Sequence, residues 1–105
     1  MTGHFAITRK PSTGRHPLVV LQASGELDLA ARDELRAAIV HAVSAGSGVT
    51  VDLEAVTFLD SEALGALIEG FNASRARGAG FRVVNAHDVV ERVLTVSGAK
   101  DLFDS

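Results

Sequence analysis

The sequence predicts an α/β domain in which helices pack on a mixed β-sheet, with the elements in the order β-β-α-β-α-β-α. Segment 18–25 begins as an apolar run and then alternates, as a mostly buried strand does, and segment 49–53 places apolar residues at alternate positions. The segments after Asp28 and Asp60 place them three and four residues apart, the period of a helix buried on one face. Strand–helix–strand units require parallel, right-handed crossovers, and a short polar loop joins the first two strands. We therefore expect parallel strands together with one antiparallel hairpin.

The first half of the chain should form this hairpin and then a helix. His4 to Arg9 is a short strand, and residues 10–17 form a loop because they contain two prolines and a glycine. Leu18 to Gly25 is the second strand. Asp28 is the expected N-cap of the first helix, and Gly46 follows its last turn. The inward face of this helix is expected to comprise Ala31, Leu35, Ala38, Ile39, Ala42 and Val43.

The second half should alternate strands and helices. Val49, Val51 and Leu53 mark the central strand, and Asp60 precedes a helix that the segment "RARGAG" closes with terminal cations and glycine. The segment "FRVVNA" is a further strand, and "DVVERVLTVSG" is a third helix, followed by one last short turn in "AKDLFDS". The third helix is expected to face inward with Val89, Val90, Val93 and Leu94.

The composition excludes several classes of protein. Ten Lys and Arg against 13 Asp and Glu give a formal charge of -3, so a phosphate-backbone binder is not expected. There are no cysteines, and the four histidines are too scattered to form a recognisable metal-ligand motif, so neither a metal nor a cofactor is predicted. The N-terminus lacks the apolar core of a signal peptide, and no apolar run is long enough to span a membrane. We expect a soluble cytoplasmic protein without a membrane or nucleic-acid partner.

The sequence carries no recognisable catalytic motif. It has neither a G-x-S-x-G elbow nor a phosphate-binding glycine loop, and nothing in the spacing of its carboxylates and histidines organises a catalytic triad. Ser61 is the residue whose role stays open. If Asp60 caps the helix, Ser61 is its first residue, with an exposed hydroxyl at the positive end of the helix dipole, where a phosphate would be favoured. The same position also suits a serine that only starts the helix.

Three stretches in sequence order resemble the STAS domain family, which is named for sulphate transporters and anti-sigma factor antagonists. The segment "ASGELDLAARDEL" is similar to its G-E-[LI]-D motif, and "VTVDLEAVTFLDSEALGAL" to its central strand and D-S-[ST]-G-L-G loop. The segment "VVERVLTVSGAKDLFDS" is similar to the closing R-[LV]-[LF]-x-x-[ST]-G-L-x-x-[LI]-F motif. The three cover nearly the whole chain, so the resemblance implies one STAS domain over residues 1–105.

The resemblance implies an anti-sigma factor antagonist, which is a binding protein and not an enzyme. Such a protein binds an anti-sigma factor, in the best-known systems a kinase-like ATPase, and so frees the sigma factor. The kinase phosphorylates the serine after the loop aspartate, and a phosphatase restores it. By position, the phosphoacceptor is Ser61 and the partner-binding residues are Glu26, Asp28, Asp60, Ser61 and Glu62.

Three positions depart from the family motifs. Glu62 and Ala63 replace the hydroxyl residue and the glycine after the serine, and Ala99 replaces a leucine. The Glu62 carboxylate is expected to oppose a phosphate on Ser61 or to mimic it in part. The alternative function is a ligand-sensing STAS module that binds a nucleotide or another small anion at the strand ends. A hydrolase that uses Ser61 would require a histidine base close to it.

Overall fold

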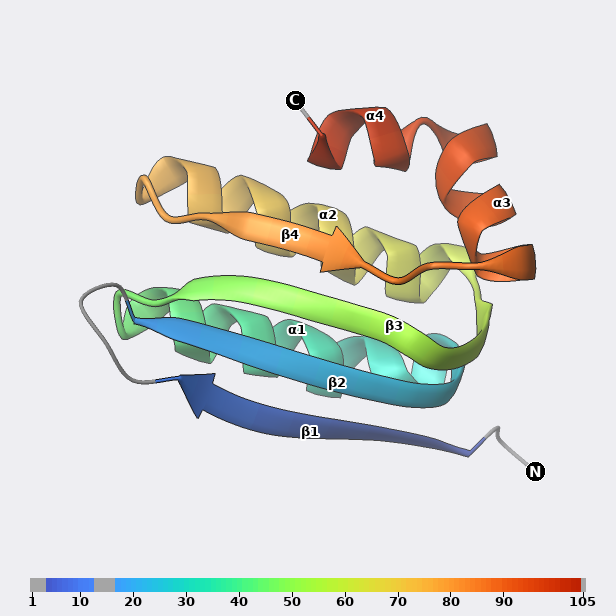
Figure 1. Cartoon of the computed structure of the whole chain (residues 1–105), viewed down its shortest axis with the longest axis horizontal. Helices are drawn as coiled ribbons and strands as arrows, with labels where there is room; N and C mark the ends of the chain where they lie inside the picture. The colour runs from blue at the N-terminus through green and yellow to red at the C-terminus, as the bar shows by residue number, and fades with distance from the viewer. Residues whose placement is uncertain (1–3, 13–16, 105) are drawn as a thin grey trace.

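The computed structural model describes residues 4–12 and 17–104, which are built around a four-stranded sheet (Figure 1). The strands are β1 (Phe5–Ser12), β2 (Leu18–Leu27), β3 (Gly48–Leu59) and β4 (Phe81–Val84), and they lie in this order across the sheet. β1 pairs antiparallel with β2, whereas β2, β3 and β4 run parallel. The predicted mixed sheet is confirmed.

Two long helices, α1 (Leu29–Ser44) and α2 (Ser61–Ala76), lie side by side on one face of the sheet (Figure 1). The chain then continues from β4 into α3 (Asp88–Ser97) and the short α4 (Ala99–Phe103). Figure 1 shows α3 at the end of the molecule where α2 begins. The predicted last short turn is therefore a separate helix of five residues.

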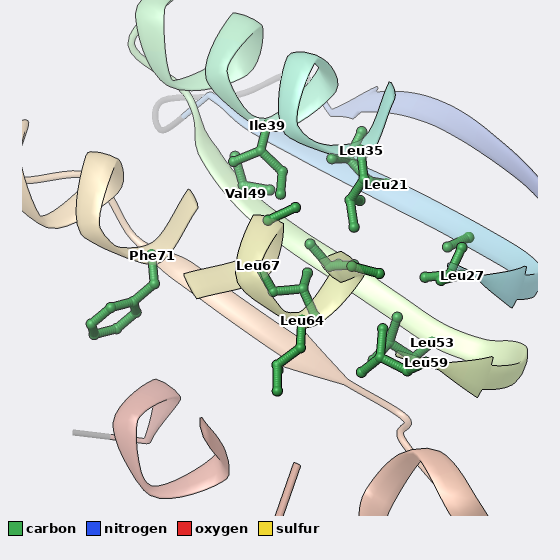
Figure 2. Packing of buried hydrophobic residues seen from close by; sticks show 14 of the residues in the cluster. Leu21, Leu27, Leu35, Ile39, Val49, Leu53, Leu59, Leu64, Leu67 and Phe71 are labelled. Carbon is green, nitrogen blue, oxygen red and sulfur yellow. The ribbon is translucent and has the colours of Figure 1, made fainter. Parts of the chain in front are cut away.

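The core lies between the sheet and the helices α1 and α2 (Figure 2). Leu21 and Leu53 of the strands belong to one buried cluster with Leu35 and Ile39 of α1 and Leu67 of α2, and all five side chains are fully buried. Close contact between the two helices depends on Gly70 of α2. A Cβ atom there would lie 2.6 Å from Cγ2 of Ile39, so no side chain fits without movement.

β3 is longer and less regular than the sequence predicted. Its buried residues alternate from Val49 to Leu53 and then recur three apart, at Val56 and Leu59. Each of the two interruptions coincides with a register shift against β2, where β3 advances one residue more than its neighbour. Such bulges bend a strand and re-aim its side chains. With these two shifts, Leu59 at the end of β3 is the register partner of Leu27 at the end of β2.

One prediction about α3 is wrong. Val90 and Leu94 are buried four residues apart, as expected, but Val89 is 54% exposed. Successive helical residues point about 100° apart, so the face that buries Val90 and Leu94, with Val93 partly buried between them, turns Val89 toward solvent. At the other end of the chain, β1 extends to Ser12, and residues 13–16 of the predicted loop lie outside the described residues.

Candidate functional site

The carboxyl ends of β2 and β3 place two of the predicted site residues at one edge of the sheet. Leu27 and Leu59 are register partners, and the N–H of Asp60 donates a hydrogen bond of 3.0 Å to the carbonyl oxygen of Leu27. Asp28 and Asp60 each follow directly on these paired residues. The first turns of α1 and α2 therefore begin beside each other.

Both aspartates are N-caps, as the sequence predicted. Asp28 accepts a hydrogen bond of 2.9 Å from the N–H of Ala30, and Asp60 accepts one of the same length from the N–H of Ala63. Because Asp60 caps α2, Ser61 is the first residue of that helix. Its side chain is exposed, and its hydroxyl has no hydrogen bond within residues 4–12 and 17–104.

Glu26 lies two residues before Asp28, at an exposed position near the end of β2. It is the register partner of Phe58 on β3, and its N–H donates to the carbonyl oxygen of His4 at 3.0 Å. The preceding Gly25 has a φ of +81°, and a Cβ on it would lie 2.0 Å from the oxygen of His4. The glycine of the "GELD" segment is therefore required for the close approach of β1.

Glu62 does not carry an unpaired charge at the start of α2. Nη1 of Arg32, on α1, donates a hydrogen bond of 2.8 Å to Oε1 of Glu62, and the two side chains are 40% and 48% exposed. Nε of the same guanidinium donates to Asp33 at 3.2 Å. The hydrogen bond to Glu62, and then the one to Asp33, raise the pKa of Arg32, which stays charged. No local sequence pattern predicts this pair, because its members are 30 residues apart.

An apolar groove of about 440 Å³ runs between the start of α2 and α3. Ser61 lies on its wall, and Val96 of α3, opposite, is 81% exposed. The lining residues are Leu59, Ser61, Leu64, Arg92, Val93, Val96 and Ser97. Residues of α3 were not among the predicted site residues. The one signal for them in the sequence is Val96, an apolar residue outside the expected buried face of this helix.

His87 connects the start of α3 to β3. Its Nδ1 lies 2.9 Å from a carboxylate oxygen of Asp88, and its Nε2 lies 2.7 Å from the carbonyl oxygen of Glu54. Both partners only accept hydrogen bonds, so both contacts are satisfied when the ring is protonated. The bond to Asp88, and then the one to Glu54, raise the pKa of His87. Both ring nitrogens therefore contact Asp88 and Glu54 and not the hydroxyl of Ser61. His87 does not supply the histidine base that a hydrolase using Ser61 would require.

A second hollow, of about 520 Å³, lies on the sheet over β1, β2 and β3. Its lining among the described residues includes Asp52 and Glu54 and no lysine or arginine, so its charge disfavours an anionic ligand. Within the described residues no three histidines, aspartates or glutamates gather as a candidate metal site. No helix in the described part of the chain has the length and apolarity needed to cross a membrane.

Comparison with known proteins assigns the class. Residues 8–105 match the family model of the STAS domain, so the chain belongs to the STAS domain family. It is similar to the anti-sigma-B factor antagonist of Bacillus subtilis (strain 168), with 24% identity over 86 residues that cover 82% of this chain and 79% of the relative.

Solved structures agree with this assignment. An anti-sigma factor antagonist from Mycobacterium paratuberculosis has a TM-score of 0.78 and 26% identity, over 93% of this chain and 83% of that one. The phosphorylated form of SpoIIAA, a Bacillus cell fate determinant, has a TM-score of 0.66 and 23% identity, over 90% of this chain and 86% of that one. The chain therefore has the fold of proteins described as anti-sigma factor antagonists.

Proposed function

We propose that the protein is a cytoplasmic anti-sigma factor antagonist that binds a kinase-like anti-sigma factor and is released when Ser61 is phosphorylated. The observation that carries the proposal is the position of Ser61. It is the first residue of a helix already capped by Asp60, its side chain is exposed, and it lies on an apolar groove. The relatives named as anti-sigma factor antagonists support the choice of partner.

The proposed docking surface is the end of the molecule where α1 and α2 begin. The groove beside Ser61 offers apolar area, and the acids Glu26, Asp28 and Asp60 lie along the neighbouring strand ends. An apolar centre with a charged rim is typical of protein–protein interfaces. The partner would bury apolar side chains in the groove and dock against the acids at its rim.

Phosphorylation would use ATP bound to the anti-sigma factor. Oγ of Ser61 attacks the γ-phosphorus, the new O–P bond forms as the bond to the β,γ-bridging oxygen breaks, and ADP leaves. A base on the kinase takes the hydroxyl proton. The phosphate would then face the unpaired N–H groups of the first turn of α2, which favour an anion. A separate phosphatase would restore the hydroxyl.

The charge added to Ser61 is large enough to end the interaction. Phosphorylation adds about -1.5 to -2 charges. Against a partner carboxylate about 6 Å away, at an effective dielectric constant of about 40, each charge costs about 1.4 kcal/mol. The total of about 2 to 3 kcal/mol weakens binding about 30- to 100-fold.

Affinity capture from the native cytosol tests the choice of partner. The wild type and Ser61→Ala should retain a protein that mass spectrometry identifies as a kinase-like anti-sigma factor, whereas Ser61→Asp should lose it. Intact-mass analysis of the recovered wild type should detect a phosphorylated fraction. Equal capture by Ser61→Asp would argue against a docking surface at Ser61.

A ligand-sensing module is the second candidate function. Its ligand, a nucleotide or another small anion, would bind at the strand ends, where the negative charges of Asp28, Asp60 and Glu26 oppose an anion. Thermal denaturation with and without nucleotides separates the two functions. A ligand sensor predicts a rise in melting temperature without any kinase, and the proposed antagonist predicts none.

A further inference from the structure

The residue beside the proposed phosphoacceptor is an acid, and an arginine of the neighbouring helix balances its charge. Glu62 follows Ser61 directly, and its carboxylate accepts a hydrogen bond of 2.8 Å from Arg32. A free carboxylate at this place would repel a phosphate on its neighbour. A carboxylate paired with an arginine adds little net charge beside the phosphate.

We propose that Arg32 is the positioning residue that makes Ser61 compatible with a phosphate, because it pairs with Glu62 and neutralises the acid next to the phosphorylation site. This inference rests on the proposed phosphorylation of Ser61. Arg32 acts through Glu62: its two bonded partners in the described part of the chain are Glu62 and Asp33, and neither of them is the serine.

The structure offers a matched control in a second ion pair between the same two helices. Nε of Arg36 lies 3.1 Å from Oε2 of Glu69, and both side chains are exposed. Glu69 lies eight residues after Ser61, about 12 Å along the helix axis. That distance exceeds the Debye length of about 10 Å at 0.1 M salt. Breaking this pair changes the contact between the helices without changing the charge beside Ser61.

The test measures the second pKa of phosphoserine, incorporated genetically at position 61, by ³¹P NMR titration at 0.1 M salt. In the otherwise unchanged chain this pKa should lie near its usual value of about 6. Arg32→Gln should raise it by about 0.4, the effect of a carboxylate about 7 Å away at an effective dielectric constant of about 40 with partial screening. Arg36→Gln should change it by no more than about 0.15, because the carboxylate of Glu69 is farther away and more strongly screened.

The double variant Arg32→Gln with Glu62→Gln decides whether Arg32 acts through Glu62. Its phosphate pKa should return close to that of the otherwise unchanged phosphoprotein, because the unpaired carboxylate is gone. Glu62→Gln alone should lower the pKa, since it leaves Arg32 free near the phosphate. That variant keeps the test decisive if Arg32→Gln fails to fold.

An equal rise in the Arg32 and Arg36 variants would overturn the inference. So would a phosphate pKa that stays as high in the double variant as in Arg32→Gln, because the rise would then not come from the unpaired carboxylate of Glu62. Neither result depends on the kinase or on the anti-sigma factor. The titration can therefore contradict the role of Arg32 while the proposed function is judged separately, by partner binding.

Discussion

Replacing Gly70 by alanine should destabilise the protein, although alanine is the better helix former. The new methyl group would lie 2.6 Å from Cγ2 and 3.0 Å from Cδ1 of Ile39, and 3.2 Å from a ring carbon of Phe81. Ile39 is fully buried and branched at Cβ, so its side chain cannot readily rotate away. Overpacking of this kind costs about 1 to 3 kcal/mol, whereas the helix propensity of alanine returns about 1 kcal/mol. We expect a net loss of about 1 kcal/mol.

Gly65, on the same helix, is the matched control. An added Cβ there meets nothing within 4 Å, so Gly65→Ala gains helix propensity without a clash and should stabilise by about 0.5 to 1 kcal/mol. Chemical denaturation of both variants measures the difference, which isolates the steric cost at Gly70. If Gly70→Ala is at least as stable as Gly65→Ala, then α1 and α2 do not approach as closely as described.

Three further predictions concern the site and its partners. Asp60→Ala should lower the free energy of unfolding by about 1 kcal/mol through loss of the cap, whereas Asp60→Asn should keep most of the stability that the cap contributes. If urea denaturation shows equal losses for the two variants, the charge of Asp60 is needed and not its capping hydrogen bond. Stability contributed by His87 should be fully present below the usual histidine pKa of about 6.5 and be lost as the pH rises through the raised pKa of the folded state. The free energy of unfolding should thus fall more between about pH 6 and 8 in the wild type than in His87→Gln, and parallel profiles would contradict the double contact of the ring. The net charge of -3 predicts no saturable binding to a labelled promoter duplex at physiological salt, and a sub-micromolar complex in fluorescence anisotropy would contradict it.

The fold and the two caps could be predicted because local signals determine them. Asp28 and Asp60 each precede a helical pattern, and an N-cap is set by a side chain and the backbone two or three residues later. The parallel arrangement of β2, β3 and β4 follows from the helices between them. In the same way, the position of Ser61 as first residue of α2 follows directly from the cap before it.

The surroundings of Ser61 could not be predicted, because they depend on contacts between distant segments. Arg32 of α1 reaches Glu62 of α2 because these helices follow Leu27 and Leu59, which a register with two bulges in β3 makes partners. The sequence therefore suggested a free carboxylate beside the serine where the structure has a paired one. The groove on α3 was missed for a similar reason, since the exposure of Val96 depends on how the short helix packs.

Calorimetry of binding to the anti-sigma factor, before and after stoichiometric phosphorylation of Ser61, measures whether the phosphate releases the partner. The phosphorylated protein, and likewise Ser61→Asp, should fold normally and bind at least about 10-fold more weakly than the unmodified chain. Ser61→Ala should bind like the wild type, because it adds no charge. Equal affinities of the phosphorylated and unmodified proteins for that partner would show that phosphorylation of Ser61 does not control binding.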